Sequence, residues 1–353
     1  MPFELINERY LKQTWQQSPF VQQASLFQDI VIRCVRYAFA EVPASIGKVF
    51  FSKGVALPFF SFRKLRHGVV RSPIHWQEVD EAGLQGIWMI EDETEKPDVV
   101  VYYCHGGGFS MGSSYFYIEF LLGLVAILKE SGYRNPALFA LEYTLVPEAT
   151  FPKQIHQAQA GYDFVLTKVD DPAKVCVAGD SAGATLVLSL LLSLAKPPVQ
   201  RSRLPGFATL ISPWTTILSP ENRNTSSDYL NATTLHQYGS QYLGHQATDD
   251  DPVASPGTCS DLSWWKRASP VHGWFFIYGT EEVFTSEAQK MVRMLRKAGS
   301  EVTVHEEPAG IHAWPVVKLF LCDSQSERQS GLRSIVKAIK ANMPPESQDL
   351  TKV

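Results

Sequence analysis

The sequence predicts an α/β protein in which a mostly parallel β-sheet carries helices on both faces. From about residue 75 onward, short apolar runs alternate with helical patterns. The runs are continuously apolar rather than alternating, which indicates strands that are buried on both faces. Strand–helix alternation of this kind is typical of a doubly wound sheet. A chain of 353 residues, 45% of them hydrophobic, can bury such a core without disulfides or metal ions.

The elements of this sheet are expected over residues 76–345, which we take as the main domain. The expected strands are 99–104, 137–141, 175–178, 207–211, 274–278 and 301–305. The expected helices lie near 115–130, 153–168, 182–195, 284–298 and 327–342, and Gly299 is a suitable stop signal for the fourth of them.

Three segments do not follow the strand–helix rhythm. Residues 1–75 are rich in aromatic side chains and have a helical sequence pattern. Residues 218–256 are an irregular insert rich in Asn, Ser, Thr, Tyr and Asp. We expect both to form caps over the carboxyl ends of the strands, where open α/β sheets bind ligands. The aromatic side chains of 1–75 favour a lid over an apolar pocket, and contact with a membrane surface is the less favoured alternative. Residues 346–353 form a polar tail.

Composition and charge exclude several classes of protein. The net charge of −4 argues against a nucleic-acid partner, since proteins that bind nucleic acids are usually basic. The start of the chain lacks the basic and then apolar pattern of a secretory signal, and no uncharged run reaches the length of about 18 residues that a membrane span needs. We therefore expect a cytoplasmic protein; its oligomeric state is not predicted.

The cysteines point to neither a metal nor a disulfide framework. Their number is odd, they are widely scattered, and none has the C-x-x-C spacing. A reducing compartment is the better expectation, with no metal and no organic cofactor. The five are Cys34, Cys104, Cys176, Cys259 and Cys322.

The strongest local motif is a G-x-S-x-G pentapeptide between the expected strand 175–178 and a leucine-rich helix. Its residues are Gly179, Asp180, Ser181, Ala182 and Gly183. In this context the serine occupies a sharp strand-to-helix turn, where the helix N-terminus favours developing negative charge. Small residues on either side let strand and helix approach each other. The motif predicts that Ser181 is a nucleophile; the alternative is an ordinary glycine-bracketed turn.

A second motif, His-Gly-Gly-Gly at 105–108, follows the expected strand 99–104 directly. Residues without side chains let backbone N–H groups point into a cavity, as an oxyanion hole requires. A phosphate-binding loop is the competing interpretation, but the G-K-[ST] ending and the G-x-G-x-x-G pattern are both missing. We expect His105 to order this loop by hydrogen bonding rather than to act as a base.

A nucleophilic serine needs a base and an acid that orients the base, and in this fold the chain order is Ser, acid, His. His312 lies in a loop after the expected strand 301–305, and His305 within that strand is the second choice. The loop after strand 274–278 offers Glu281 and Glu282 but no aspartate. We expect Glu282 to be the acid and keep Glu281 as the reserve.

The motifs at 105–108 and 179–183 resemble the hormone-sensitive-lipase-like branch of the α/β-hydrolases. Further segments that match this branch are 143–148, 151–152, 251–252 and 255–256. The resemblance therefore covers about residues 95–320. The segments 143–148, 281–284 and 312–315 look most like those of fungal members of this branch. These members include steryl-acetate hydrolases and esterase-like enzymes of natural-product gene clusters.

The resemblance implies an α/β-hydrolase fold and a set of roles. Residues 76–345 would be the catalytic domain, with Ser181, Glu282 and His312 as the triad. The oxyanion amides would be those of Gly107, Gly108 and Ala182, with His105, Gly106, Gly179, Asp180 and Gly183 as supporting motif residues. The chain departs from many relatives by having Glu282 in place of an aspartate and Ala184 in place of a second glycine.

These observations predict a serine hydrolase that cleaves a carboxylic ester of a bulky apolar small molecule through an acyl-enzyme. Two alternatives stay open. A site that excludes water would let the same triad serve cyclisation, condensation, elimination or acyl transfer in secondary metabolism. The second alternative is a small-molecule receptor on a hydrolase fold, which the presence of all three candidate triad residues disfavours.

Overall fold

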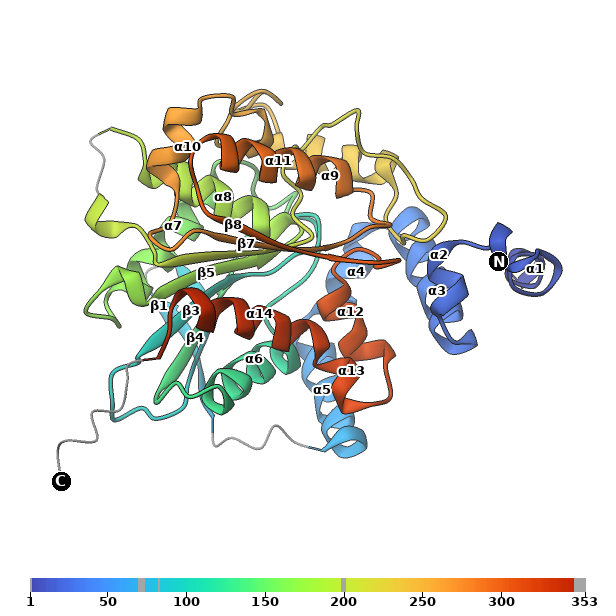
Figure 1. Ribbon diagram of the computed structural model, residues 1–353, viewed down its shortest axis with the longest axis horizontal. Coiled ribbons are helices and arrows are strands. Elements are labelled where there is room, and N and C mark those ends of the chain that lie inside the picture. The colour runs from blue at the N-terminus through green and yellow to red at the C-terminus, as the bar shows by residue number, and fades with distance from the viewer. Residues whose placement is uncertain (1, 69–73, 82, 198–200, 346–353) are drawn as a thin grey trace.

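An eight-stranded β-sheet forms the centre of the protein in the computed structural model, which describes residues 2–68, 74–81, 83–197 and 201–345 (Figure 1). The strands are β1 (His75–Glu81), β2 (Leu84–Ile90), β3 (Val99–Cys104), β4 (Pro136–Glu142), β5 (Val175–Asp180), β6 (Phe207–Ile211), β7 (Trp274–Gly279) and β8 (Val302–Glu307). Their spatial order is β1-β2-β4-β3-β5-β6-β7-β8.

Six of the strands, β3 to β8, pair in parallel, which confirms the prediction of a mostly parallel sheet. The other two, β1 and β2, form an antiparallel edge on β4 and were not predicted. Six of the seven residues of β1 are exposed, because the strand lies at the sheet edge. A search for continuous apolar runs therefore cannot find it.

Helices cover both faces of the sheet (Figure 1). The helices α7, α8, α10 and α11 form one layer, and α6, α12 and α14 form the other. Alternate residues of β3 serve the two layers: Val100 and Tyr102 belong to one apolar cluster, Val101 and Tyr103 to the other. The bounds are α6 (Ile118–Glu130), α7 (Lys153–Leu166), α8 (Ala182–Leu194), α10 (Leu262–Ala268), α11 (Thr285–Lys297), α12 (Trp314–Leu321) and α14 (Ser330–Asn342).

Most predicted helices are confirmed within a few residues, and α11 ends before Gly299, which has a φ of +88°. The helix predicted near 327–342 is confirmed as α14, which begins at Ser330 after the separate short helix α13 (Gln325–Arg328). The Ser330 hydroxyl donates a hydrogen bond to the carbonyl of Glu327 at this break. Serine competes in this way for backbone groups and favours helix ends.

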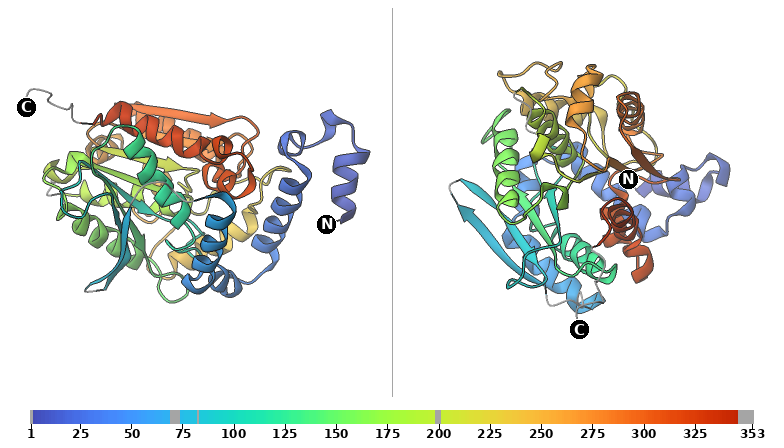
Figure 2. Two further views of the ribbon diagram at one scale, coloured as in Figure 1. Left: turned by 90° about the horizontal axis from the view of Figure 1, so that it is seen from below. Right: turned by 60° about the vertical axis from the view of Figure 1, so that its left-hand side comes forward.

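The N-terminal segment consists of helices that lie beside the carboxyl ends of the strands. They are α1 (Pro2–Ile6), η1 (Asn7–Leu11), η2 (Thr14–Gln16), α2 (Pro19–Gln23), α3 (Leu26–Glu41), α4 (Ala44–Phe51) and α5 (Lys53–His67). Figure 2 shows that α1 stands out from the body of the protein. Buried Arg33 on α3 pairs with Asp29 and with Glu8, and the second pair joins η1 to α3.

The insert 218–256 contains α9 (Ala232–Leu243) and contacts the N-terminal segment. Arg36 on α3 donates hydrogen bonds to the backbone carbonyls of Ser226 and Asp228. Two segments that are far apart in the sequence are thereby joined at the same end of the sheet. The predicted polar tail, 346–353, lies outside the described residues. Within the described ranges, no helix is both long enough and apolar enough to cross a membrane.

Candidate active site

Ser181 lies at a tight turn between β5 and α8. Its φ of +51° and ψ of −119° are unusual for a residue with a side chain, and such backbone strain is concentrated at functional sites. The turn requires glycine on both sides. A Cβ atom on Gly183 would lie 2.0 Å from the carbonyl oxygen of Cys104, and one on Gly179 would lie 2.6 Å from the backbone of Gly183. The predicted strand–turn–helix context of the motif is therefore confirmed.

The glycine loop 105–108 is joined to this turn through Asp180. The buried Asp180 carboxylate accepts hydrogen bonds from the Gly106 N–H at 2.8 Å and from the hydroxyls of Tyr103 and Tyr117 at 2.8 and 2.6 Å. Gly107 and Gly108 have positive φ values of +110° and +61°, and both line the same cavity as Ser181. Ala182 begins α8, so its N–H is one of the helix-terminal donors without a partner inside the helix.

His105 contacts the backbone of the glycine loop and an aromatic ring beside it. Its ring Nδ1 and the carbonyl oxygen of Gly106 are 2.7 Å apart, and its ring stacks on Tyr143 with a centroid separation of 4.4 Å. Burial lowers the pKa of His105 to about 4, so the ring is neutral at physiological pH. A neutral ring whose Nδ1–H donates to the loop backbone supports the shape of the loop.

His312 and Glu282 form a buried pair on adjacent loops, after β8 and β7 respectively. The distance from Nδ1 of His312 to Oε2 of Glu282 is 3.3 Å, and both residues are only 3% exposed. The other carboxylate oxygen of Glu282 accepts hydrogen bonds from the Ser212 hydroxyl at 2.6 Å and from the Gly279 N–H. Burial raises the pKa of Glu282, whereas these two hydrogen bonds favour its carboxylate form.

Burial and nearby carboxylates act on the pKa of His312 in opposite directions. Burial lowers the pKa of His312, and the negative charges of Asp228 and Asp180 partly offset this effect. The contact to Glu282 occupies Nδ1, so Nε2 is the ring nitrogen available to accept a proton.

The two reserve candidates lie elsewhere. Glu281 accepts a hydrogen bond from the Ser227 hydroxyl at 3.1 Å and is only half-buried. His305 lies within β8, where its Nε2 is 3.1 Å from a carboxylate oxygen of Glu307. Neither residue lines the cavity that contains Ser181.

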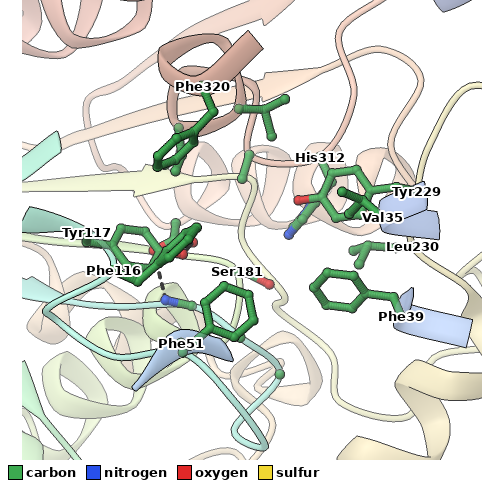
Figure 3. Close-up of a pocket in the computed structure, with 18 of the residues that line it drawn as sticks. Val35, Phe39, Phe51, Phe116, Tyr117, Ser181, Tyr229, Leu230, His312 and Phe320 are labelled. Atoms are coloured by element: carbon green, nitrogen blue, oxygen red, sulfur yellow. Dashed lines mark hydrogen bonds between the residues drawn. The ribbon is translucent and has the colours of Figure 1, made fainter. Parts of the chain in front are cut away.

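Ser181 and His312 line a cavity of about 270 Å³ (Figure 3). In Figure 3, Phe51, Phe116 and Tyr117 flank one side of Ser181, and Phe39, Tyr229 and Leu230 flank the other. Apolar side chains of three segments form most of the wall. They come from the N-terminal helices (Val31, Val35, Phe39, Phe50, Phe51, Phe59), from the insert (Tyr229, Leu230, Leu235, Tyr238) and from α12 (Val316, Val317, Phe320).

Sequence reasoning missed two polar residues of the site. Ser212 follows β6 directly, and its Oγ donates to Glu282 while accepting the N–H of Ala313 at 2.9 Å. A polar residue at the carboxyl end of a strand beside β5 is a signal that could have identified it. Asp228, in the insert, contacts the backbone at Val283 and His312. It has no comparable signal in the sequence.

Comparison with known proteins places the chain in a family. Residues 101–316, more than half of the chain, match the family model described as alpha/beta hydrolase fold. An acetyl-hydrolase of Streptomyces hygroscopicus is 32% identical over 219 residues, which are 60% of this chain and 67% of that protein. The "Putative steryl acetyl hydrolase mug81" of Schizosaccharomyces pombe is 24% identical over 254 residues, 68% of this chain and 65% of that protein.

The fold comparison agrees. The crystal structure of an esterase from the bacterial hormone-sensitive lipase family superimposes with a TM-score of 0.71 at 20% identity, covering 91% of this chain and 99% of that one. The chain belongs to the α/β hydrolase fold family. The predicted fold, the resemblance to the hormone-sensitive-lipase-like branch and the prediction of an ester-cleaving hydrolase are thereby confirmed.

Proposed function

We propose that the protein is a serine esterase that cleaves a carboxylic ester of a bulky apolar molecule through an acyl-enzyme. The observation that carries the proposal is that Ser181, at a strained turn, and His312, which is paired with the buried Glu282, line the same apolar cavity. A nucleophile, a base and an acid that orients the base are the parts that acyl transfer needs.

In the first half-reaction, Nε2 of His312 takes the hydroxyl proton of Ser181 while Oγ forms a bond to the ester carbonyl carbon. The carbonyl oxygen becomes negatively charged and is stabilised by the N–H groups of Gly107, Gly108 and Ala182. His312 then returns the proton to the departing alkoxide oxygen, the C–O bond breaks, and the alcohol leaves. Water repeats the sequence on the acyl-enzyme and releases the carboxylic acid.

Glu282 has a supporting role in both half-reactions. Its carboxylate accepts the Nδ1–H of His312, which fixes the tautomer of the ring and stabilises the imidazolium that forms in each transition state. Ser212 and Gly279 hold the carboxylate in place through its other oxygen. Glutamate thus replaces aspartate without loss of the contact that the base needs.

The substrate class follows from the cavity wall and from the relatives. A wall made mainly of Phe, Tyr, Leu and Val side chains favours an apolar group on at least one side of the ester. The names of the two relatives refer to an acetyl and to a steryl acetyl hydrolase. We therefore propose an acetate ester of a sterol-like or natural-product-like alcohol.

The N-terminal segment is proposed to be a lid that selects this substrate. Val35 and Phe39 of α3 and Phe51 of α4 line the cavity, and Phe39 packs against Tyr229 of the insert with a ring-centroid separation of 5.5 Å. Helices α3, α4 and α5 and the insert 218–256 together supply apolar walls to a site whose chemical groups come from 76–345. Such walls exclude water and shape the pocket.

The test is hydrolysis of p-nitrophenyl esters of graded chain length by the wild type and by Ser181→Ala. The wild type should release p-nitrophenol, and the variant should lose at least about 10³-fold in kcat/KM while keeping its circular dichroism spectrum. Ser193→Ala, on the same helix α8 but outside the cavity wall, is the matched control and should keep its activity. Undiminished turnover by Ser181→Ala would contradict the proposal.

A further inference from the structure

We propose that Asp228 is a positioning residue for the Ser181 reaction: its buried carboxylate ties the Glu282 loop to the His312 loop and holds a negative charge beside His312. This inference rests on the proposed function. It gives the insert 218–256 a second role, because the insert would then support the base as well as line the pocket.

The contacts of the Asp228 side chain span both loops. Its Oδ1 accepts the backbone N–H of His312 at 3.1 Å and that of Tyr229 at 2.8 Å. Its Oδ2 accepts the backbone N–H of Val283, the residue after Glu282, at 2.9 Å. One carboxylate therefore sets the separation between the chain segments that carry the acid and the base. Asp228 is 1% exposed, so water does not compete for these hydrogen bonds.

Asp228 is itself held from two directions. Its backbone N–H donates to the Thr225 hydroxyl oxygen at 2.9 Å, and the same hydroxyl donates to the carbonyl of Glu281 at 2.7 Å. Its carbonyl accepts a hydrogen bond from Nε of Arg36 on α3 at 2.9 Å. The insert, the acid loop and the N-terminal segment thus converge on one residue.

The charge of Asp228 acts on the proton that His312 carries during the reaction. Three carboxyl groups face His312: Glu282 from its loop, Asp180 from the end of β5 and Asp228 from the insert. Asp228 in turn faces Arg36, Glu282, Tyr229 and His312. Burial raises the pKa of Asp228 to about 6, which leaves it ionised at neutral pH. A fixed negative charge stabilises the imidazolium in a low-dielectric site.

The test compares Asp228→Asn with the wild type in kcat, KM and the pH profile of kcat/KM on a p-nitrophenyl ester. The amide keeps the shape of the side chain, removes the charge and replaces one of its two acceptors with a donor. We expect kcat to fall roughly 10- to 100-fold with KM changed by less than about 3-fold. The acid limb of the profile should move to lower pH, because the pKa of His312 falls when the nearby negative charge is lost.

Two further variants separate charge from shape. Asp228→Glu keeps the charge and should leave the acid limb near its wild-type pH, even where longer hydrogen bonds lower kcat. Asp251→Asn is the matched control, since Asp251 lies in the same insert and accepts the N–H of Val253 at 2.8 Å without touching either loop. It should keep both kcat and the pH profile.

The outcomes distinguish this inference from the proposed function. A wild type without turnover and without Ser181 labelling by a fluorophosphonate contradicts the proposed function. An active wild type together with an Asp228→Asn variant of unchanged kcat contradicts the inference alone. A lowered kcat with an unmoved acid limb shows a structural role only and also overturns it. If Asp228→Asn does not fold, an acid limb moved in Asp228→Glu would overturn the role of the charge.

Discussion

The turn at Ser181 and the N-terminal helices meet at the same cavity but are built in opposite ways. Around Ser181 the backbone is packed so closely that two glycines have no room for a Cβ atom. In the N-terminal segment, Phe3, Trp15 and Leu65 are 87%, 74% and 89% exposed. The first region tolerates almost no change, whereas the second presents apolar side chains with few constraints. The proposed catalytic role and the proposed substrate-selecting role therefore fall in regions that differ in how closely they are packed.

The largest effect is expected at the turn, for Gly183→Ala. The added Cβ would lie 2.0 Å from the Cys104 carbonyl oxygen, so β3 and α8 would have to move apart and displace Ser181. We expect turnover to fall by more than about 10³-fold, or the melting temperature to fall by several degrees, because overpacking costs about 1–3 kcal/mol. Gly54→Ala on α5 is the control, since its Cβ would meet nothing within 4 Å. Near-normal activity of Gly183→Ala would mean that the turn has room for a Cβ atom at residue 183, against the close packing described for it.

The next largest effect is expected for Glu282→Gln, measured as kcat on a p-nitrophenyl ester. The amide cannot hold His312 in the required tautomer, and the loss should be roughly 10²- to 10⁴-fold with the fold retained. Glu281→Gln is the neighbouring control and should change kcat by less than about 2-fold. The reverse pattern would assign the acid to Glu281.

A smaller effect is expected in the N-terminal segment, for Phe39→Ala. Removal of a cavity-lining ring should raise KM for long or bulky esters about 10-fold while leaving p-nitrophenyl acetate nearly unaffected. Phe27→Ala removes an exposed ring on the same helix that does not line the cavity, and should alter neither KM. Equal losses on short and long esters would show that the segment supports the chemistry itself.

The smallest effect is expected for Trp15→Ser, in the short helix η2 that precedes α3. Trp15 is largely exposed, and exposed positions of this kind usually change the free energy of unfolding by no more than about 0.5 kcal/mol. Chemical denaturation should give an unchanged midpoint, and kcat/KM should match the wild type. A large loss of stability would indicate that η2 packs against another surface in solution.

The same contrast explains what could be predicted from the sequence. Ser181 and the glycine loop 105–108 carry local signals, because the turn and the loop are fixed by a few adjacent residues. The choice between Glu281 and Glu282 had no local signal. Only the folded structure shows which carboxylate turns inward to His312 and Ser212. Spacing alone could not separate two neighbouring glutamates.

Contacts between distant segments account for the rest of what was missed. Asp228 accepts hydrogen bonds from backbone N–H groups that are 55 and 84 residues away, so no pattern in its own neighbourhood reveals these contacts. The packing of α3 against the insert depends in the same way on long-range contacts. The edge strand β1 was missed because an exposed edge does not need an apolar run.

The most direct test of the central claim is to locate the adduct that a fluorophosphonate probe forms with the folded protein, by peptide mass spectrometry. One adduct is expected, on Ser181, because among the serines that the structure describes it alone combines a strained turn, helix N-terminal amides and a histidine in the same cavity wall. Ser181→Ala should remain unlabelled under the same conditions. An adduct on a different residue, or a folded wild-type protein that no probe labels, would contradict the account.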